Sequence, residues 1–312
     1  MHIEKRKQKK RIKYYLAHSF REGSKVHKIR KYLGVDLKET ILKERKQKAE
    51  ALILEEINKY KIIQDPLNME LSKKDLEIVK KLEAKIPLRV SHLSEKQWKI
   101  FSELFTYSTN AIEGSKLNSK EVRDILGEDK WPDKSKSDIA EAYGVNEAIE
   151  FIRNTKEHIS IEFLREIHKI VFKNSKSFAG EFRKPNQEVI VADSLGNVVH
   201  EGAPQVRVIA LLNELVEWYN NHKNKYPALV LAAVIHNQFE NIHPFADGNG
   251  RVGRILLNNI LLKHNFPPMN IDFKNRAEYY ASLQAYERKH DLKPTIDLFM
   301  KEYKALKKIL SG

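Results

Sequence analysis

The segment from His243 to Arg254 reads HPFADGNGRVGR and combines an imidazole, a carboxylate, a glycine-rich turn and two arginines. His243 could take up a proton at neutral pH, which makes it the candidate general base. Asp247 carries a hard carboxylate of the kind that holds Mg²⁺ beside phosphates. Arg251 and Arg254 are three positions apart, so on a helix they share a face and could reach the same anion. The set predicts chemistry on the phosphates of a nucleotide.

Two predicted helices must position this segment. Residues 228–239 are apolar and follow Pro227, a residue favoured in the first turn of a helix, and residues 252–262 again have helical spacing. The segment is therefore a loop between helices, in which Gly248 and Gly250 let the backbone N–H groups at the start of the second helix approach an anion. Taken alone, Asp247 could simply form a turn, and the two arginines could simply lie on a solvated helix face. The combination of these residues favours a phosphate site.

The segment resembles the signature of the Fic family, His-Pro-Phe-x-x-Gly-Asn-Gly-Arg-x-x-Arg, at every defined position, and the similarity runs from about residue 100 to about residue 300. Fic proteins are helical enzymes that mostly transfer AMP from ATP to a hydroxyl side chain of a target protein (AMPylation). The resemblance implies His243 as catalytic base, Mg²⁺ at Asp247, and phosphate binding by Gly248, Asn249, Gly250, Arg251 and Arg254. The phosphotransferases of the wider fold lack part of Gly-Asn-Gly-Arg, which this chain keeps whole.

A second segment, Thr109-Asn-Ala-Ile-Glu113-Gly114, resembles the inhibitory motif of the same family, Ser/Thr-x-x-x-Glu-Gly/Asn. On a helix Thr109 and Glu113 lie one turn apart on the same side, and Gly114 permits a sharp stop. The resemblance implies that Glu113 pairs with Arg254 and competes with the γ-phosphate, as in the class with an N-terminal inhibitory helix. In some relatives this glutamate instead positions a water that removes AMP, and the sequence leaves the direction open.

Two further segments carry expectations about substrates. A predicted β-hairpin, residues 189–192 and 198–200, corresponds to the family's flap, beside which a target segment would add as a strand along Val189, Ile190 and Val191; a surface hairpin without a role is the alternative. Tyr279 and Tyr280 match a pair that lies near the adenine in relatives. Glu287 stands where some relatives place an asparagine on the base, which puts the adenine contact in doubt.

Composition limits the class of protein. The 312 residues can bury one large core or two modest ones, and 41% hydrophobic residues suit a globular protein. The chain contains no cysteine, which excludes disulfides and thiolate catalysis. No apolar run is long enough for a membrane span and no secretory signal opens the chain, so we expect a cytoplasmic protein without a membrane partner.

The fold expected is all-α, a Fic helical core with a short β-hairpin flap, preceded by a small α+β region. We place this basic hairpin-helix region in residues 1–65 and the Fic domain in residues 66–312, with the inhibitory helix at about 100–114 and the catalytic core at about 160–300. Helical spacing is found in the segments 37–60, 73–85, 95–112, 119–126, 137–154, 160–173, 204–222, 227–241, 250–264, 274–288 and 294–309. Strands 12–20 and 25–33, joined by a glycine turn, form the N-terminal hairpin.

The predicted function is an autoinhibited protein adenylyltransferase that uses ATP and Mg²⁺ on a Ser, Thr or Tyr hydroxyl of an unidentified target, with self-modification open. The alternatives are removal of AMP and transfer of another NMP group. A net charge of +14, concentrated in the first 50 residues, allows a different class: a basic nucleic-acid-binding regulator with a secondary catalytic domain. A zinc site at His236, His243 and Asp247 is disfavoured because Pro244 breaks the helix between the last two. Whether the protein forms a homodimer is left open by the sequence.

Overall fold

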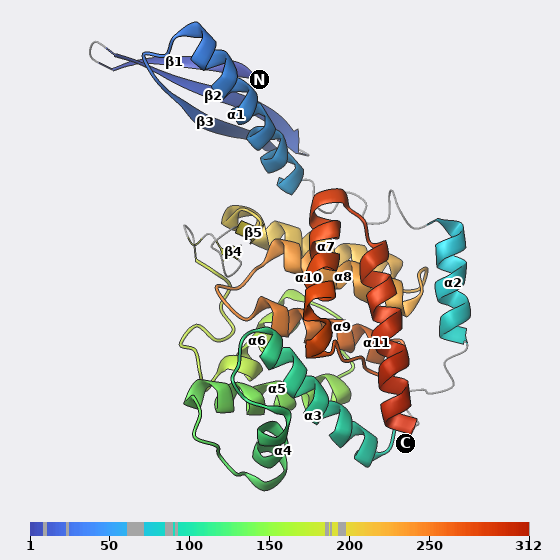
Figure 1. Cartoon of the computed structure of the whole chain (residues 1–312). Coiled ribbons are helices and arrows are strands. Elements are labelled where there is room, and N and C mark those ends of the chain that lie inside the picture. Colours follow the sequence, from blue (N-terminus) through green and yellow to red (C-terminus); the bar gives the residue numbers. More distant parts are fainter. Residues whose placement is uncertain are drawn as a thin grey trace. The chain divides into compact units, whose positions relative to one another are not determined.

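The computed structural model describes residues 1–8, 11–22, 25–60, 72–84, 90, 93–184, 187, 189–192 and 198–311. The chain divides into two compact units, Met1–Gln64 and Asp65–Gly312 (Figure 1). Within the described ranges, no helix is both long enough and apolar enough to cross a bilayer.

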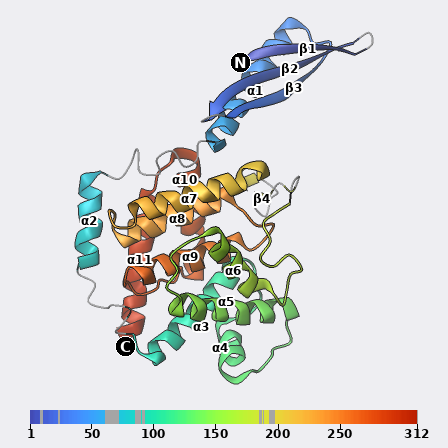
Figure 2. The ribbon, with the colours of Figure 1, turned by 180° about the vertical axis from the view of Figure 1, so that it is seen from behind.

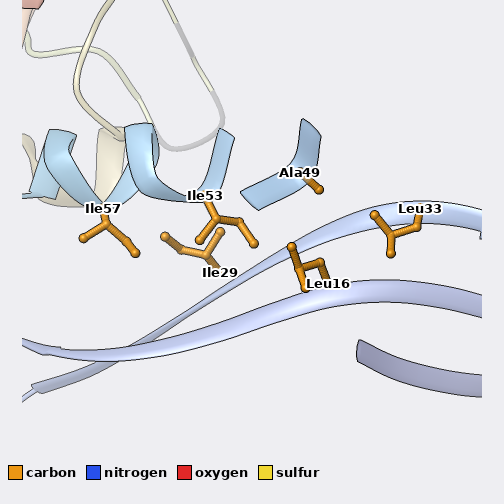
Figure 3. Packing of buried hydrophobic residues seen from close by; sticks show 6 residues of the cluster. All are labelled: Leu16, Ile29, Leu33, Ala49, Ile53 and Ile57. Carbon is orange, nitrogen blue, oxygen red and sulfur yellow. The ribbon is translucent and has the colours of Figure 1, made fainter. Parts of the chain in front are cut away.

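The N-terminal unit is a three-stranded antiparallel sheet with one helix packed on it. Strands β1 (His2–Gln8), β2 (Arg11–Glu22) and β3 (Lys25–Val35) lie in the order β1-β2-β3, followed by helix α1 (Glu39–Tyr60). Leu16, Ile29 and Leu33 of the sheet pack against α1 (Figure 3). A hydrophobic face buried under a helix supplies the stability that a lone hairpin lacks.

The sequence predicted the β2–β3 hairpin and the helix but missed β1. Strand β1 consists mostly of charged and polar residues. Among its described residues, Ile3 is the hydrophobic one that packs against the buried cluster. Edge strands commonly carry charge because it prevents pairing with other chains, which removes the hydrophobic alternation by which strands are recognised. The basic run at residues 5–13 therefore lies largely in strands rather than in a tail.

The second unit is helical, as predicted, with a two-stranded hairpin (Figure 2). Its helices are α2 (Lys73–Ala84), α3 (Glu95–Ile112), α4 (Ser119–Glu128), α5 (Lys136–Asn154), α6 (Ile161–Phe172), α7 (Val208–His222), α8 (Ala228–Ile242), α9 (Asn249–Lys263), α10 (Arg276–Lys289) and α11 (Lys293–Ser311). Short 3₁₀ turns, Gln205–Arg207 and Phe273–Asn275, precede α7 and α10. The hairpin joins β4 (Ile190–Ala192) to β5 (Val198–Glu201).

Helix starts follow from local side-chain chemistry. Ser94 caps α3 in a reciprocal arrangement with Gln97, and Asn118 caps α4 in the same way with Glu121. These caps satisfy backbone N–H groups that have no partner within the helix. They fix where α3 and α4 begin.

The core of this unit is the helix pair α8 and α9. Every residue of α8 is buried, and α9 is buried from Arg251 to Leu262. A helix that is apolar on all sides is stable only when other helices surround it. The loop between α8 and α9 therefore starts and ends on the most firmly held elements of the fold.

Candidate active site

His243 is the residue at which α8 stops. It has a left-handed backbone (φ 52, ψ 60), and its N–H donates to the carbonyl of Phe239 at 3.0 Å. Its Nδ1 lies 3.2 Å from the carbonyl oxygen of Glu240. A carbonyl can only accept, so this contact makes Nδ1 the donor of the neutral ring and Nε2 its acceptor. His243 also lines a cavity, described below, and is oriented as a general base requires.

The loop after His243 is held by buried contacts. Phe245 is fully buried and stacks on His168, with ring centroids 3.9 Å apart. The side-chain amide of Asn249 accepts from the N–H of Phe245 at 2.9 Å and donates to its carbonyl at 2.8 Å. Asn249 thus shapes the loop through both ends of its amide. It also lines the cavity described below, and its predicted contact with phosphates stays a prediction.

Two residues outside the motif brace this loop. Arg183, which is 2% exposed, donates from Nε to the carbonyl of His243 at 2.9 Å and also bonds the carbonyls of Ile242 and Ala203. His168 accepts from the N–H of Gly180 at Nδ1, so its Nε2 donates to the carbonyl of Asp247 at 3.1 Å. Burial lowers the pKa of His168 to about 4, which keeps it neutral in this role.

Gly248 precedes the first turn of α9 with φ +85, and a Cβ there would overlap the ring of Phe172. We expect Gly248→Ala to lower the free energy of unfolding by about 2–4 kcal/mol, since strain and overlap add. Gly127 is the matched control, because a Cβ there would meet only Lys99 Nζ at 3.8 Å. Gly127→Ala should be stabilising by about 0.5–1 kcal/mol. Urea unfolding of both variants checks this; equal effects would contradict the assigned role of Gly248.

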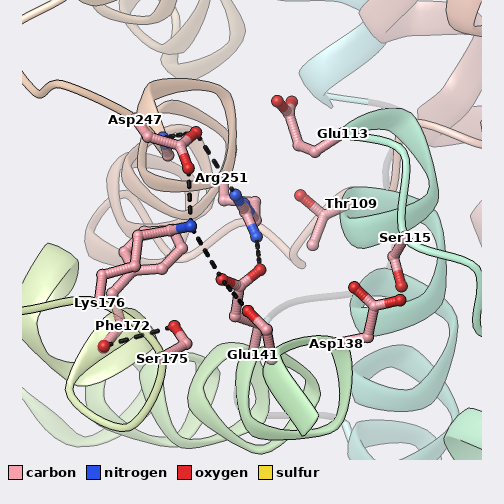
Figure 4. A network of polar contacts seen from close by, with 12 residues as sticks. Thr109, Glu113, Ser115, Asp138, Glu141, Phe172, Ser175, Lys176, Asp247 and Arg251 are labelled. Carbon is pink, nitrogen blue, oxygen red and sulfur yellow. Dashed lines mark hydrogen bonds and ion pairs between the residues drawn. The ribbon is translucent and has the colours of Figure 1, made fainter. Parts of the chain in front are cut away.

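Asp247 belongs to a charged network with Lys176, Arg251 and Glu141 (Figure 4). Its carboxylate is half-exposed, accepts from the N–H of Gly248 at 2.6 Å, and lies 2.7 Å from Lys176 Nζ. Burial works to raise the pKa of Asp247, but the bond from Lys176 and the charge of Arg251 hold it below its ordinary value. The carboxylate is therefore ionised, as a cation ligand must be.

Arg251 does not meet the expectation that both arginines reach one anion. Its guanidinium bonds Glu141 on α5 and lies 4.6 Å above the ring of Phe172. With 6% of its side chain exposed, it is absent from the residues that line the cavity. The buried carboxylate of Glu141 on α5, which the sequence gave no reason to single out, holds the Arg251 guanidinium.

Arg254 is bound instead to α3. Its Nε donates to Thr109 Oγ1 at 2.8 Å, and its Nη2 donates to the Thr109 carbonyl at 3.0 Å and to Glu113 Oε1 at 2.7 Å. The predicted pairing of Glu113 with Arg254 is thus present. Helix α3 ends at Ile112, Glu113 is its C-cap, and Gly114 follows with φ +93. The sharp stop that glycine allows places the carboxylate at Arg254.

Glu113 also lies against the start of α9. A Cβ on Gly250 would overlap Glu113 Oε1, so a larger residue there would force the Glu113 side chain to shift. The first turn of a helix presents N–H groups without intrahelical acceptors and the positive end of the helix dipole. Glu113 therefore places negative charge at a helix start that attracts anions.

A cavity of about 340 Å³ lies over this surface. Its lining includes His243, Asp247, Arg254 and Glu113 at one part, and Tyr279, Tyr280, Leu283, Gln284 and Glu287 of α10 at another. The volume is at the lower end of the range for small-molecule sites. Both ends predicted for the nucleotide thus open into one space.

The tyrosines have structural contacts of their own. Tyr279 is buried, and its hydroxyl accepts from Arg254 Nη1 at 3.2 Å and lies 3.0 Å from His236 Nε2. The hydroxyl of Tyr280 donates to the carbonyl of Ile112 at 3.1 Å, joining α10 to the end of α3. Contact of either ring with adenine stays a prediction.

Comparison with known proteins identifies this unit. The family model described as Fic/DOC matches residues 158–261. The protein carries a Fic domain. Over 210 residues, covering 65% of this chain, it is 34% identical to protein adenylyltransferase fic-1 of Caenorhabditis briggsae, and over 202 residues it is 33% identical to protein adenylyltransferase Fic of Nematostella vectensis.

Solved structures agree in fold. A structure of Fic-1 from Caenorhabditis elegans superposes with a TM-score of 0.63 at 27% identity, covering 89% of this chain and 78% of that one. A Fic family protein from Desulfovibrio desulfuricans has a TM-score of 0.67 at 21% identity, covering 80% of this chain and 77% of that one. The chain spans only 40% and 44% of the two full-length relatives named above.

Glu240 is a buried carboxyl of the Fic domain that the sequence did not single out. It lines the cavity from α8, is 8% exposed, and its Oε1 has no hydrogen-bond partner among the described residues. Burial raises the pKa of Glu240 to about 8; the charge of Arg254 opposes this and that of Glu113 adds to it. Glu240 is therefore neutral at pH 7.

This pKa predicts a pH-dependent stability. Because the folded-state pKa is raised to about 8 from an ordinary value of 4.5, stability relative to Glu240→Gln should be greatest below pH 4.5 and fall as the pH rises to 8. The slope can reach about 1.4 kcal/mol per pH unit. Denaturant unfolding at pH 6, 7 and 8 measures it. The control is Glu278→Gln, at a half-exposed ion pair with Lys301. If the stability difference between wild type and variant had the same pH slope for Glu240→Gln and Glu278→Gln, the prediction would be contradicted.

The flap hairpin lies at the edge of the site. Strands β4 and β5 pair antiparallel, Ile190 opposite Glu201, and the N–H of Gly202 donates to the carbonyl of Val189 at 3.0 Å. Val189 lines the cavity beside His243. The hairpin backbone thus reaches the candidate base.

Among the described residues, no three His, Asp or Glu side chains gather into a group that could hold a metal ion by themselves. His236, part of the zinc alternative, lies in the core on Tyr279.

Proposed function

We propose that the Fic domain transfers AMP from ATP to a hydroxyl side chain of a protein target. The observation that carries this is the position of His243, oriented through Nδ1 on the wall of a cavity that also contains Arg254 and the start of α9. Two relatives whose names state protein adenylyltransferase activity support it.

The chemistry follows from these side chains. His243 Nε2 takes the proton of a Ser, Thr or Tyr hydroxyl, and the hydroxyl oxygen forms a bond to the α-phosphorus. The bond from that phosphorus to the bridging oxygen breaks, and pyrophosphate leaves with its charge. Arg254 and the N–H groups at the start of α9 stabilise that charge, an electrostatic contribution that is usually the largest in such reactions.

We further propose that Asp247 holds Mg²⁺ during turnover. Its half-exposed, ionised carboxylate on the cavity wall is a suitable hard ligand, and Mg²⁺ commonly takes only one or two carboxylates together with substrate phosphates. The ion would neutralise phosphate charge. Lys176, at 2.7 Å, occupies one carboxylate oxygen and would have to share it.

Glu113 is proposed to inhibit this reaction. Its carboxylate uses the Arg254 guanidinium and the start of α9, which are the donors that the outer phosphates of ATP need. One anion excludes the other, so productive ATP binding requires Glu113 to leave.

Target binding is proposed at the flap. A segment added along Val189–Val191 would be held by main-chain hydrogen bonds, which do not depend on its side chains. The hydroxyl residue would then lie near His243, since Val189 and His243 line the same cavity.

Position-specific labelling of ATP tests the proposal. Purified protein is incubated with a cell extract as target source, Mg²⁺, and ATP labelled on the α- or γ-phosphate, using both the wild type and Glu113→Gly. We expect protein-bound label from α-labelled ATP alone. Label from the γ-position would make the protein a kinase, and no label from either would refute AMP transfer.

A further inference from the structure

The sheet of the N-terminal unit has two faces of different chemistry. Side chains alternate between faces along each strand, and residues paired across strands share a face. Leu16, Ile29 and Leu33 define the face under α1, with Lys31 paired to Glu56 of that helix (Figure 3). The intervening residues make up the opposite face, which we call the open face.

The open face is strongly basic. In the register of the three strands it carries six cations against one carboxylate among the described residues. The carboxylate is Glu4, which lies 2.5 Å from Lys28 Nζ and 2.9 Å from Arg30 Nε and is shared between them. The cations are Arg6, Arg11, Lys13, Arg21, Lys28 and Arg30. One carboxylate cannot neutralise this charge, so the face attracts anions.

Aromatic rings lie in the middle of this charge. Tyr15 of β2 and Tyr32 of β3 are cross-strand partners with ring centroids 5.3 Å apart. Tyr32 is 56% exposed, and the guanidinium of Arg6 lies 5.4 Å from the centre of the Tyr15 ring. A sheet stabilised by α1 on its other side gains little from an exposed tyrosine, so the pair is available for a ligand.

We propose that the open face binds single-stranded nucleic acid. Lysine and arginine contact its phosphates, and the rings of Tyr32 and Tyr15 stack on its bases, a combination that holds single strands with little regard to sequence. A duplex hides the faces of its bases and offers no surface for such stacking. An acidic protein segment would match the charge but leave the tyrosines without a planar partner.

The test uses the full chain and a fluorescein-labelled dT20 strand in an anisotropy titration at several salt concentrations, with a duplex of equal length beside it. We expect tighter binding of the single strand, and Tyr32→Ala to weaken it by about five- to a hundredfold while Tyr32→Phe retains it. Lys13→Gln/Arg21→Gln should lower the salt slope by about 1.4, at roughly 0.7 per phosphate contact.

Charge-matched and site-matched controls separate this surface from others. Lys43→Gln/Lys48→Gln removes the same charge from α1 and should leave binding within twofold of wild type, and saturating ATP should not displace the strand. Equal loss in both double variants, unchanged binding by Tyr32→Ala, preference for the duplex, or displacement by ATP would each overturn the proposal. None of these outcomes depends on AMP transfer.

Discussion

Glu113→Gly is expected to raise the initial rate of AMP transfer by about 10- to 100-fold. In the wild type the carboxylate lies 2.7 Å from Arg254 Nη2 and against Gly250, where it occupies the donors that we propose for the outer phosphates. A charged hydrogen bond of this type contributes about 1.5–3 kcal/mol, which corresponds to that range of rates if it must break before ATP binds productively. The rate is measured with α-labelled ATP at subsaturating concentration.

The control is Glu128→Gly, which also removes a glutamate at the end of a helix, here α4, where it pairs with exposed Lys130. It should leave the rate unchanged. Removal of AMP is assayed separately on target modified beforehand, because loss of a reverse reaction would also raise net labelling. If the forward rate of Glu113→Gly equals that of the wild type, the ion pair does not limit transfer.

The sequence predicted most of what depends on local pattern. Helical periodicity located α3 with the bounds observed, and the motif placed His243, Asp247 and Arg254 around one cavity. These predictions succeed because apolar spacing and glycine turns determine the structure of residues that lie close to them in sequence. The pairing of Glu113 with Arg254 was predicted correctly for a different reason, because the resemblance to a family supplied a partner that is distant in sequence.

What the sequence could not give depends on contacts between distant residues. Arg251 turns to Glu141 because α5 packs on α9, and no spacing within the motif encodes that. Arg183 donates hydrogen bonds to backbone carbonyls of the loop. Because every residue has a carbonyl, the side chains in the sequence do not identify these partners. Glu240 is distinguished by its burial, which follows from the helices packed around α8 and is not encoded by the residues next to it in sequence. Strand β1 was missed because charge replaced apolar alternation.

His243→Ala, introduced together with Glu113→Gly, is expected to reduce AMP transfer by about 10²–10⁴-fold, the contribution of a positioned general base. Among the described residues that line the cavity, His243 is the only histidine, and Val189 at the start of the flap lines the same space. ATP affinity, measured by calorimetry, should change less than about twofold, since the proposed phosphate donors are Arg254 and the start of α9. Rate and affinity thus separate the base from the binding site.

Backbone geometry requires a second variant, because His243 has φ 52 and alanine is strained there. Asparagine tolerates this conformation but cannot act as a base, so His243→Asn should fold as the wild type does and still lose transfer. His290→Ala is the control: this exposed histidine also ends its helix, α10, at φ 57. It carries the same backbone strain and should keep full activity. If His243→Asn retained more than about a tenth of the rate, the proton of the target hydroxyl would have to go to another acceptor, and the mechanism built on the Nδ1–Glu240 contact would fail.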